Sequence, residues 1–118
     1  MSGTSSAANR KFVYNTAETG IAADSAAIVI DATVCEDFEQ ADWHQIDIDA
    51  LTASSGTVLI EILPYGSLDY KTLKDSNGDS AAIDAADPYP KEVTVSVSAI
   101  RLTPQSLNGT WGYSLVGK

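Results

Sequence analysis

Hydrophobic and polar residues alternate with a period of two in several short segments of this chain. The clearest is Asp42–Leu51, where His44, Ile46 and Ile48 share one face and the residues between them face the other way. Thr57–Leu63 repeats the pattern. Such alternation is typical of strands with one buried face. Both segments are therefore predicted to be β-strands.

Turn signals separate the predicted strands and set their number. Pro64-Tyr65-Gly66 interrupts the apolar pattern, and Asn108-Gly109 is a strong hairpin signal. No segment keeps a helical period, although Glu36–Ala41 can form one helical turn. The predicted strands are Lys11–Thr16, Ala27–Val34, Asp42–Leu51, Thr57–Leu63, Leu68–Leu73, Lys91–Thr103 and Thr110–Val116, with Ser80–Asp84 as a possible eighth. We predict an all-β fold, an antiparallel β-sandwich or jelly-roll of seven or eight short strands.

The longest predicted strand contains a change of phase. The valines from Val93 to Val97 alternate in one phase, whereas Ile100 and Leu102 follow the other. One extra residue in a strand produces such a shift. We therefore expect a β-bulge or bend near Ser98-Ala99.

The N-terminal residues differ from the rest of the chain. Met1–Arg10 is small and polar, with too few apolar side chains to fold alone. We predict an extended arm over residues 1–11 and a single β-sandwich domain over residues 12–118. The arm lacks the apolar core of a secretory signal, and no run approaches the ~18 apolar residues of a transmembrane helix.

Acidic residues outnumber basic ones, and their distribution is uneven. The 118 residues include 7 Lys and Arg against 16 Asp and Glu, a formal charge of −9. No Lys or Arg lies between Lys11 and Lys71. Nucleic acids and anionic membranes bind through basic groups, so both are disfavoured as partners. The acidic surface is explained by solubility, the simpler interpretation, or by docking onto a basic protein surface.

Cys35 and His44 are the only thiol and the only imidazole of the chain. A Cys–His pair can act as a nucleophile and base. However, His44 is in phase with Ile46 and is expected to pack in the sheet, and Cys35 is expected to be a small apolar side chain. One Cys and one His also cannot supply a structural zinc site or an internal disulfide. We predict no catalytic residues.

A short acidic loop resembles part of a calcium site. Asp75, Asn77 and Asp79 place three oxygen side chains at alternate positions. Ser80 and Ala86 stand where a calcium loop has Gly and Glu. A tight turn explains the loop more simply, and we predict no metal and no cofactor.

Three other features are candidates for function: a pair of carboxylates that could act in acid–base chemistry, a glycosylation sequon and a set of aromatic side chains. Asp47 and Asp49 share the outer face of one strand, where a solvated surface is the expected role. Asn108-Gly-Thr110 fits a glycosylation sequon, but we interpret it as a turn. Aromatic side chains can stack on sugar rings, although they are also ordinary core residues. These are Trp43, Trp111, Tyr65, Tyr70, Tyr89 and Tyr113.

Three segments resemble small β-sandwich proteins of tailed bacteriophage virions. Ala41–Leu51 followed by Gly56–Leu63 resembles a pair of strands in these modules. Gly66–Leu73 is similar to one of their hairpins, and Ala99–Gly117 resembles their closing strands, with an "I-R-L-T-P" strand before a glycine-containing turn. The resemblance is to a class that includes capsid decoration (cement) proteins, head fibres and tail components.

The resemblance implies a structural role in the virion. The expected function is non-enzymatic decoration or stabilisation of the capsid, with the major capsid protein or another virion protein as partner. A homo-oligomer, plausibly a trimer, is expected. We predict that the arm reaches onto an adjacent subunit, where Arg10 and Lys11 meet acidic groups. The predicted partner-binding residues are Arg10, Lys11, Phe12 and Tyr14. The alternative is a carbohydrate-binding or receptor-facing module of a virion fibre or tail.

Overall fold

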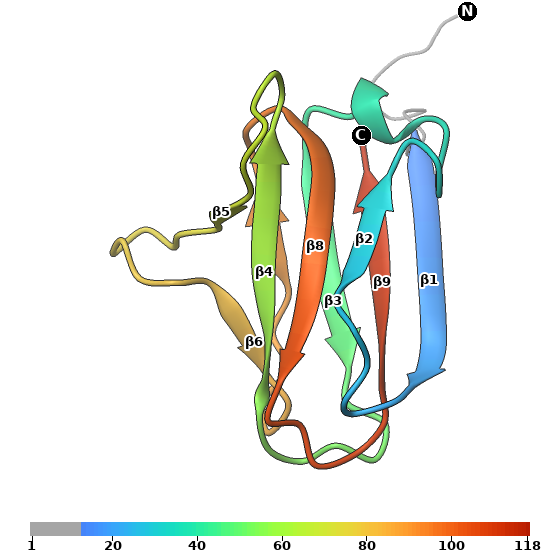
Figure 1. Ribbon diagram of the computed structural model, residues 1–118, viewed down its shortest axis with the longest axis vertical. Helices are drawn as coiled ribbons and strands as arrows, with labels where there is room; N and C mark the ends of the chain where they lie inside the picture. Colours follow the sequence, from blue (N-terminus) through green and yellow to red (C-terminus); the bar gives the residue numbers. More distant parts are fainter. Residues whose placement is uncertain (1–12) are drawn as a thin grey trace, which may run out of the picture.

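Two antiparallel sheets enclose the core in the computed structural model, which describes residues 13–118 (Figure 1). The first sheet has the order β1 (Tyr14–Ile21), β9 (Trp111–Gly117), β3 (His44–Asp49) and β7 (Lys91–Val93). The second has the order β2 (Ile28–Asp31), β8 (Val97–Gln105), β4 (Thr57–Pro64) and β5 (Lys71–Thr72), and β6 (Ala82–Asp84) also pairs with β4. The prediction of an all-β sandwich is confirmed.

The strand pairing is nested from the ends of the chain towards its middle. β1 pairs with β9, β2 with β8, β3 with β7, and β4 with both β5 and β6, all antiparallel. A long hairpin that is rolled up on itself produces this order, which is that of a jelly roll. The described residues form nine strands, one more than the largest number predicted.

The additional strand arises because the predicted strand Lys91–Thr103 is divided between the sheets. β7 pairs with β3 in the first sheet, whereas β8 pairs with β2 and β4 in the second. The prediction of one continuous strand is therefore wrong. Alternating apolar residues look the same in a strand that continues and in one that crosses to the facing sheet. Val95 lies at the crossing and is 51% exposed, unlike its buried neighbours Val93 and Val97.

The predicted bulge is present at the start of β8. Leu63 pairs with Ala99, but Pro64 pairs with Val97, so Ser98 is the extra residue. The extra residue brings both Ala99 and the residue that follows it into the core.

The Asn108-Gly109 turn does not close a hairpin, because β8 and β9 belong to different sheets. The Asn108 side chain instead anchors the crossing loop. Its Oδ1 accepts hydrogen bonds from the backbone N–H groups of Ser54 (2.7 Å) and Ser55 (3.1 Å). The hairpin prediction is therefore wrong, although the turn itself is present.

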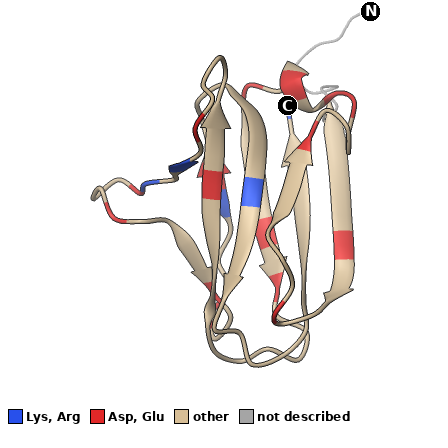
Figure 2. Ribbon diagram, in the orientation of Figure 1, with Lys and Arg blue, Asp and Glu red and all other residues tan. Residues whose placement is uncertain are grey.

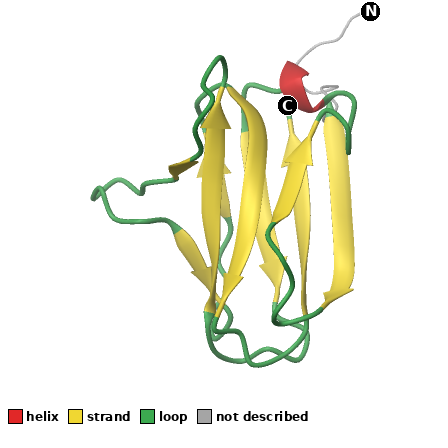
Figure 3. Cartoon of the chain, viewed as in Figure 1, coloured by secondary structure: helices red, strands yellow, loops and turns green. Residues whose placement is uncertain are grey.

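β1 is longer than the sequence predicted, whereas the predicted helical turn lies where it was expected. β1 continues past the predicted end at Thr16 as far as Ile21, because pairing with β9 holds it where its own apolar pattern stops. The register shifts between Glu18 and Ile21, and Gly20 has a positive φ of 71° there. Phe38–Gln40 forms a short 3₁₀ turn (η2), as the sequence predicted (Figure 3).

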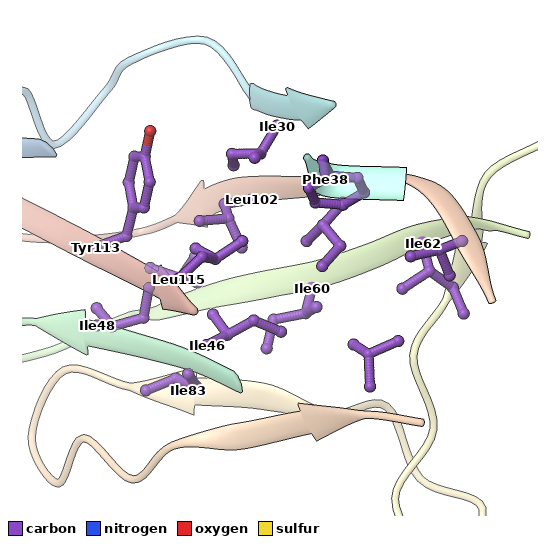
Figure 4. Packing of buried hydrophobic residues seen from close by; sticks show 14 of the residues in the cluster. Ile30, Phe38, Ile46, Ile48, Ile60, Ile62, Ile83, Leu102, Tyr113 and Leu115 are labelled. Atoms are coloured by element: carbon purple, nitrogen blue, oxygen red, sulfur yellow. The ribbon is translucent and has the colours of Figure 1, made fainter. Parts of the chain in front are cut away.

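The core is formed by the inward faces of both sheets and is closed at one end by η2 (Figure 4). His44, Ile46 and Ile48 are buried on β3, as their alternation predicted. We call the end of the sandwich near η2 the upper end; it comprises the loops 32–43, 65–70 and 94–96 (Figure 1). The lower end comprises the loops 22–27, 50–56, 85–90 and 106–110 (Figure 1).

Candidate functional site

The predicted partner-binding residues are divided by the structure. Arg10, Lys11 and Phe12 lie outside the described residues, so their contacts stay a prediction. Tyr14 begins β1 and is only 4% exposed. Its side chain cannot touch a partner unless the core opens.

Tyr14 is instead part of a buried aromatic cluster at the upper end. Its hydroxyl lies 2.7 Å from Nδ1 of His44. The ring of Phe38 is stacked on His44, with centroids 4.8 Å apart, and lies 5.2 Å from the ring of Tyr14. The cluster ties η2 and the first residues of β1 and β3 together.

The absence of a side chain at Gly117 makes room for this contact. Tyr14 and His44 both pair with Gly117, from opposite sides of β9. A Cβ at Gly117 would collide with the Tyr14 ring. The ring therefore lies across β9 and reaches the strand beyond it.

Burial controls the ionisation of this cluster. Burial lowers the pKa of His44 to about 4, against a smaller upward effect of Asp42. Burial also raises the pKa of Tyr14, and Cys35 adds to that shift. The Nε2 atom of His44 is buried without a hydrogen-bond partner, so protonation of the ring would place an unpaired charge in the core.

This arrangement argues against a Cys35–His44 pair. The Nδ1 atom of His44 is hydrogen-bonded to the Tyr14 hydroxyl, and its Nε2 atom is buried away from solvent. Cys35 is partly buried and packs against the core, as expected for a small apolar side chain. His44 therefore has a structural role at the top of the sandwich.

The loop considered for calcium is a compact turn. Asp75 Oδ1 accepts hydrogen bonds from the backbone N–H groups of Asn77 (2.8 Å) and Asp79 (3.0 Å). Gly78 has a positive φ of 83° and donates its N–H to the carbonyl of Asp75. These hydrogen bonds form a tight turn, which is how the loop was interpreted from the sequence. Residues 13–118 contain no group of three or more side chains placed to hold a metal ion.

The aromatic side chains do not form one platform. Trp111 and Tyr113 are buried in the core. Tyr65 and Tyr89 are 65% and 73% exposed, on separate loops. The ring of Tyr70 lies under the guanidinium of Arg101, 3.9 Å from its centroid. A sugar-binding surface would therefore have to use isolated rings.

The outer face of the second sheet carries a cluster that the sequence did not reveal. Arg101 donates two hydrogen bonds to the Glu61 carboxylate, from Nε at 3.0 Å and Nη2 at 2.9 Å. The pair lies side by side on β8 and β4 (Figure 2). Hydrogen bonding to Arg101 lowers the pKa of Glu61. Only the register of β4 against β8 brings these two residues together, and no local signal encodes it.

Exposed apolar side chains gather at the upper end. Leu68 is 97% exposed and Tyr65 is 65% exposed, both after β4. Val95 lies close to Tyr65 in the fold, since the Tyr65 N–H donates to the carbonyl of Ser96 at 3.1 Å. We call Tyr65, Leu68 and Val95 the apolar tip. Exposed apolar side chains at one end of a fold are candidates for contact with another protein.

The loop beside the apolar tip is acidic. Residues 32–43 contain Glu36, Asp37, Glu39 and Asp42 and no Lys or Arg. Their loop and η2 close the upper end, and η2 packs against β8, which starts beside the apolar tip (Figure 2). The upper end therefore offers apolar contacts next to negative charge.

Comparison with known proteins adds no family to this description. No family model and no curated protein matches the chain. The surface formed by residues 13–118 has no pocket. No helix in this part of the chain has the length and apolar character needed to span a membrane.

Proposed function

We propose that this protein is a non-enzymatic structural component of a bacteriophage particle that decorates or stabilises the capsid. The location of the virion-like segments supports the proposal. They include β3 and β4 and most of β8 and β9. These are the inner strands of the two sheets, so the resemblance concerns the framework of the fold.

The apolar tip is the observation that carries the proposal. A leucine that is 97% exposed adds little to the stability of its own chain. Docking onto another protein would bury Leu68 and Tyr65 and would recover the apolar area they leave in water. On a shell, symmetry repeats each such contact many times.

The acidic loop 32–43 defines the partner surface. Its four carboxylates would repel an acidic protein and favour a basic one. The proposed partner is therefore the major capsid protein, or another virion protein, with basic and apolar groups at the contact.

Co-sedimentation with capsid shells tests the proposal. The full chain is mixed with shells of the major capsid protein encoded in the same genome, and the bound fraction is measured. A Leu68→Ser/Tyr65→Ser variant should bind roughly a hundredfold more weakly, because it loses the burial of two large side chains. A matched variant, Leu51→Ser/Tyr89→Ser, changes the same residue types elsewhere on the surface and should bind like the wild type. Equal weakening by both variants, or no binding of the wild type, contradicts the proposal.

A carbohydrate-binding role in a virion fibre or tail is the second candidate. The exposed rings of Tyr65 and Tyr89 favour it, because sugars stack on exposed aromatic faces. A glycan array separates the two roles: specific glycan binding that Tyr65→Ser or Tyr89→Ser abolishes, without shell binding, supports this alternative.

A further inference from the structure

Two asparagines of the chain are followed by glycine. Asn77-Gly78 and Asn108-Gly109 are the only such pairs. In an Asn-Gly pair the backbone nitrogen of the glycine can attack the carbonyl carbon of the asparagine side chain, because glycine has no Cβ to obstruct the approach. By sequence alone the two pairs are equally reactive, but the structure places them in opposite environments.

The side-chain amide of Asn108 is held on both sides. Its Oδ1 accepts two backbone N–H groups, and its Nδ2 donates to Ser54 Oγ at 3.0 Å. The backbone of Gly109 is also packed tightly, since a Cβ there would lie 2.6 Å from the carbonyl of Thr52. For the amide of Asn108 to become free, its loop has to separate from the loop that contains Thr52 and Ser54.

Asn77 lies in the loop between β5 and β6, which projects from the body of the sandwich (Figure 1). Residues 74–80 are all exposed. Within the described part of the chain, the side-chain amide of Asn77 has no hydrogen bond, and only its backbone N–H is bonded. A Cβ at Gly78 would meet no atom within 4 Å. The Asn77 amide is therefore in open solvent.

The hydrogen bonds that fix this turn lie within it. The Gly78 N–H donates to the carbonyl of Asp75 at 3.0 Å, and the Asp75 N–H donates to the carbonyl of Asp79 at 2.8 Å. Opening the turn breaks these bonds and none to another loop or to the core. Exposed segments held only by local bonds open at low free-energy cost. The Gly78 nitrogen is thus released to react while both sheets stay intact.

We propose that Asn77 is a site of spontaneous deamidation in the folded protein and that Asn108 is protected from the same reaction. The Gly78 nitrogen forms a bond to Cγ of Asn77, and the side-chain amide group leaves as ammonia, which also takes the proton that the nitrogen loses. Water then opens the cyclic imide at either of its carbonyls. The products are aspartate and isoaspartate at this position, and water is the only co-reactant.

The modification changes the charge of an exposed loop and not the core. It adds a carboxylate between those of Asp75 and Asp79, so the loop becomes one charge more negative. The isoaspartate product also lengthens the backbone, next to the N–H groups that Asp75 Oδ1 accepts. No residue of the segment 74–80 is buried, so we expect the sandwich to remain folded. The inference is independent of the proposed virion role.

Peptide mapping by mass spectrometry tests the selectivity. The full chain is incubated at mildly alkaline pH, and conversion at both asparagines is followed over time in buffer and in guanidinium chloride. In the folded protein Asn77 should convert at least about tenfold faster than Asn108, because three hydrogen bonds must break to free the Asn108 amide. In the denatured chain the two should convert at nearly the same rate.

Two variants test the cause. Asn77→Gln, whose longer side chain closes a larger ring far more slowly, should abolish conversion at this position and leave Asn108 unchanged. Ser54→Ala removes the acceptor of Asn108 Nδ2 and should speed conversion at Asn108 several-fold, with circular dichroism checking that the variant is folded. Equal rates at both asparagines in the folded protein, the same selectivity in guanidinium chloride, or an unchanged Asn108 rate in folded Ser54→Ala overturns the proposal.

Discussion

The loops 50–56 and 106–110 at the lower end use their polar side chains differently from the loops 32–43 and 65–70 at the upper end. At the lower end, side chains bond to one another: the Thr52 and Thr110 hydroxyls lie 2.8 Å apart, and Asn108 Nδ2 donates to Ser54 Oγ at 3.0 Å. The loops 50–56 and 106–110 contain no charged residue. At the upper end, carboxylates and the apolar tip face outwards.

This difference separates residues that hold the fold from residues that are free to bind. The loops 50–56 and 106–110 connect β3 to β4 and β8 to β9, which belong to different sheets. The hydrogen bonds between these two loops therefore hold both sheets together. The upper end is held from inside, by Phe38, His44 and Tyr14. Its outer side chains therefore contribute little to folding and are available to a partner.

The largest expected effect comes from removing the internal support of the upper end. Phe38 is fully buried, and Phe38→Ala should destabilise the protein by about 3–5 kcal/mol through lost burial and a cavity. Chemical denaturation measures the change. Phe38→Leu, which fills most of the space, should cost clearly less. Equal stability of Phe38→Ala and the wild type would show that Phe38 does not support the upper end from inside the core.

The second effect is a loss of stability in acid through His44. The pKa of His44 is about 4 in the folded protein, below its ordinary value near 6.5, so the unfolded chain binds the proton first. The buried neutral ring of His44 therefore contributes fully to the free energy of unfolding above about pH 6.5. This contribution falls by about 3 kcal/mol as the pH approaches 4. Denaturation at several pH values measures it. His44→Gln, which does not titrate, should show a shallower pH dependence; identical profiles would refute this role.

At the lower end, Asn108→Ala removes three hydrogen bonds but creates no cavity. We expect a loss of about 1–2 kcal/mol, because water replaces part of the bonding at this exposed loop. Asn108→Asp keeps the acceptor for the Ser54 and Ser55 N–H groups and should lose less. Thermal unfolding measures both variants, and an unaffected Asn108→Ala would show that the lower bonds do not fasten the loops.

The smallest effect is expected at the apolar tip. Leu68→Ser should change the free energy of unfolding by less than about 0.5 kcal/mol, since the side chain is almost fully exposed. Denaturation of the wild type and the variant measures this. A loss above about 1 kcal/mol would show that Leu68 supports the fold, and its availability for a partner would then be in question.

The sequence predicts those parts of the fold that alternation controls. The inward face of β3, the bulge at Ser98 and the turn at Phe38–Gln40 follow from local patterns. The split of Lys91–Thr103 and the crossing at Asn108 do not, because a crossing between facing sheets keeps the same alternation. Local pattern reports which face is buried and not which sheet a strand joins.

At the candidate sites too, the sequence predicts which side chains are buried but not which side chains strand pairing brings together. The burial of His44 was predictable from its phase with Ile46. Its contact with Tyr14 was not, because it depends on both strands pairing with Gly117. The apolar tip also escaped prediction, since an exposed leucine in a turn resembles a strand residue in sequence.

The most direct test of the structural role is cryo-electron microscopy of capsid shells incubated with the full chain. The account predicts density for the sandwich on the shell, with loops 32–43 and 65–70 at the contact. Shells without added density, or a sandwich that contacts them through loops 50–56 and 106–110, would contradict it.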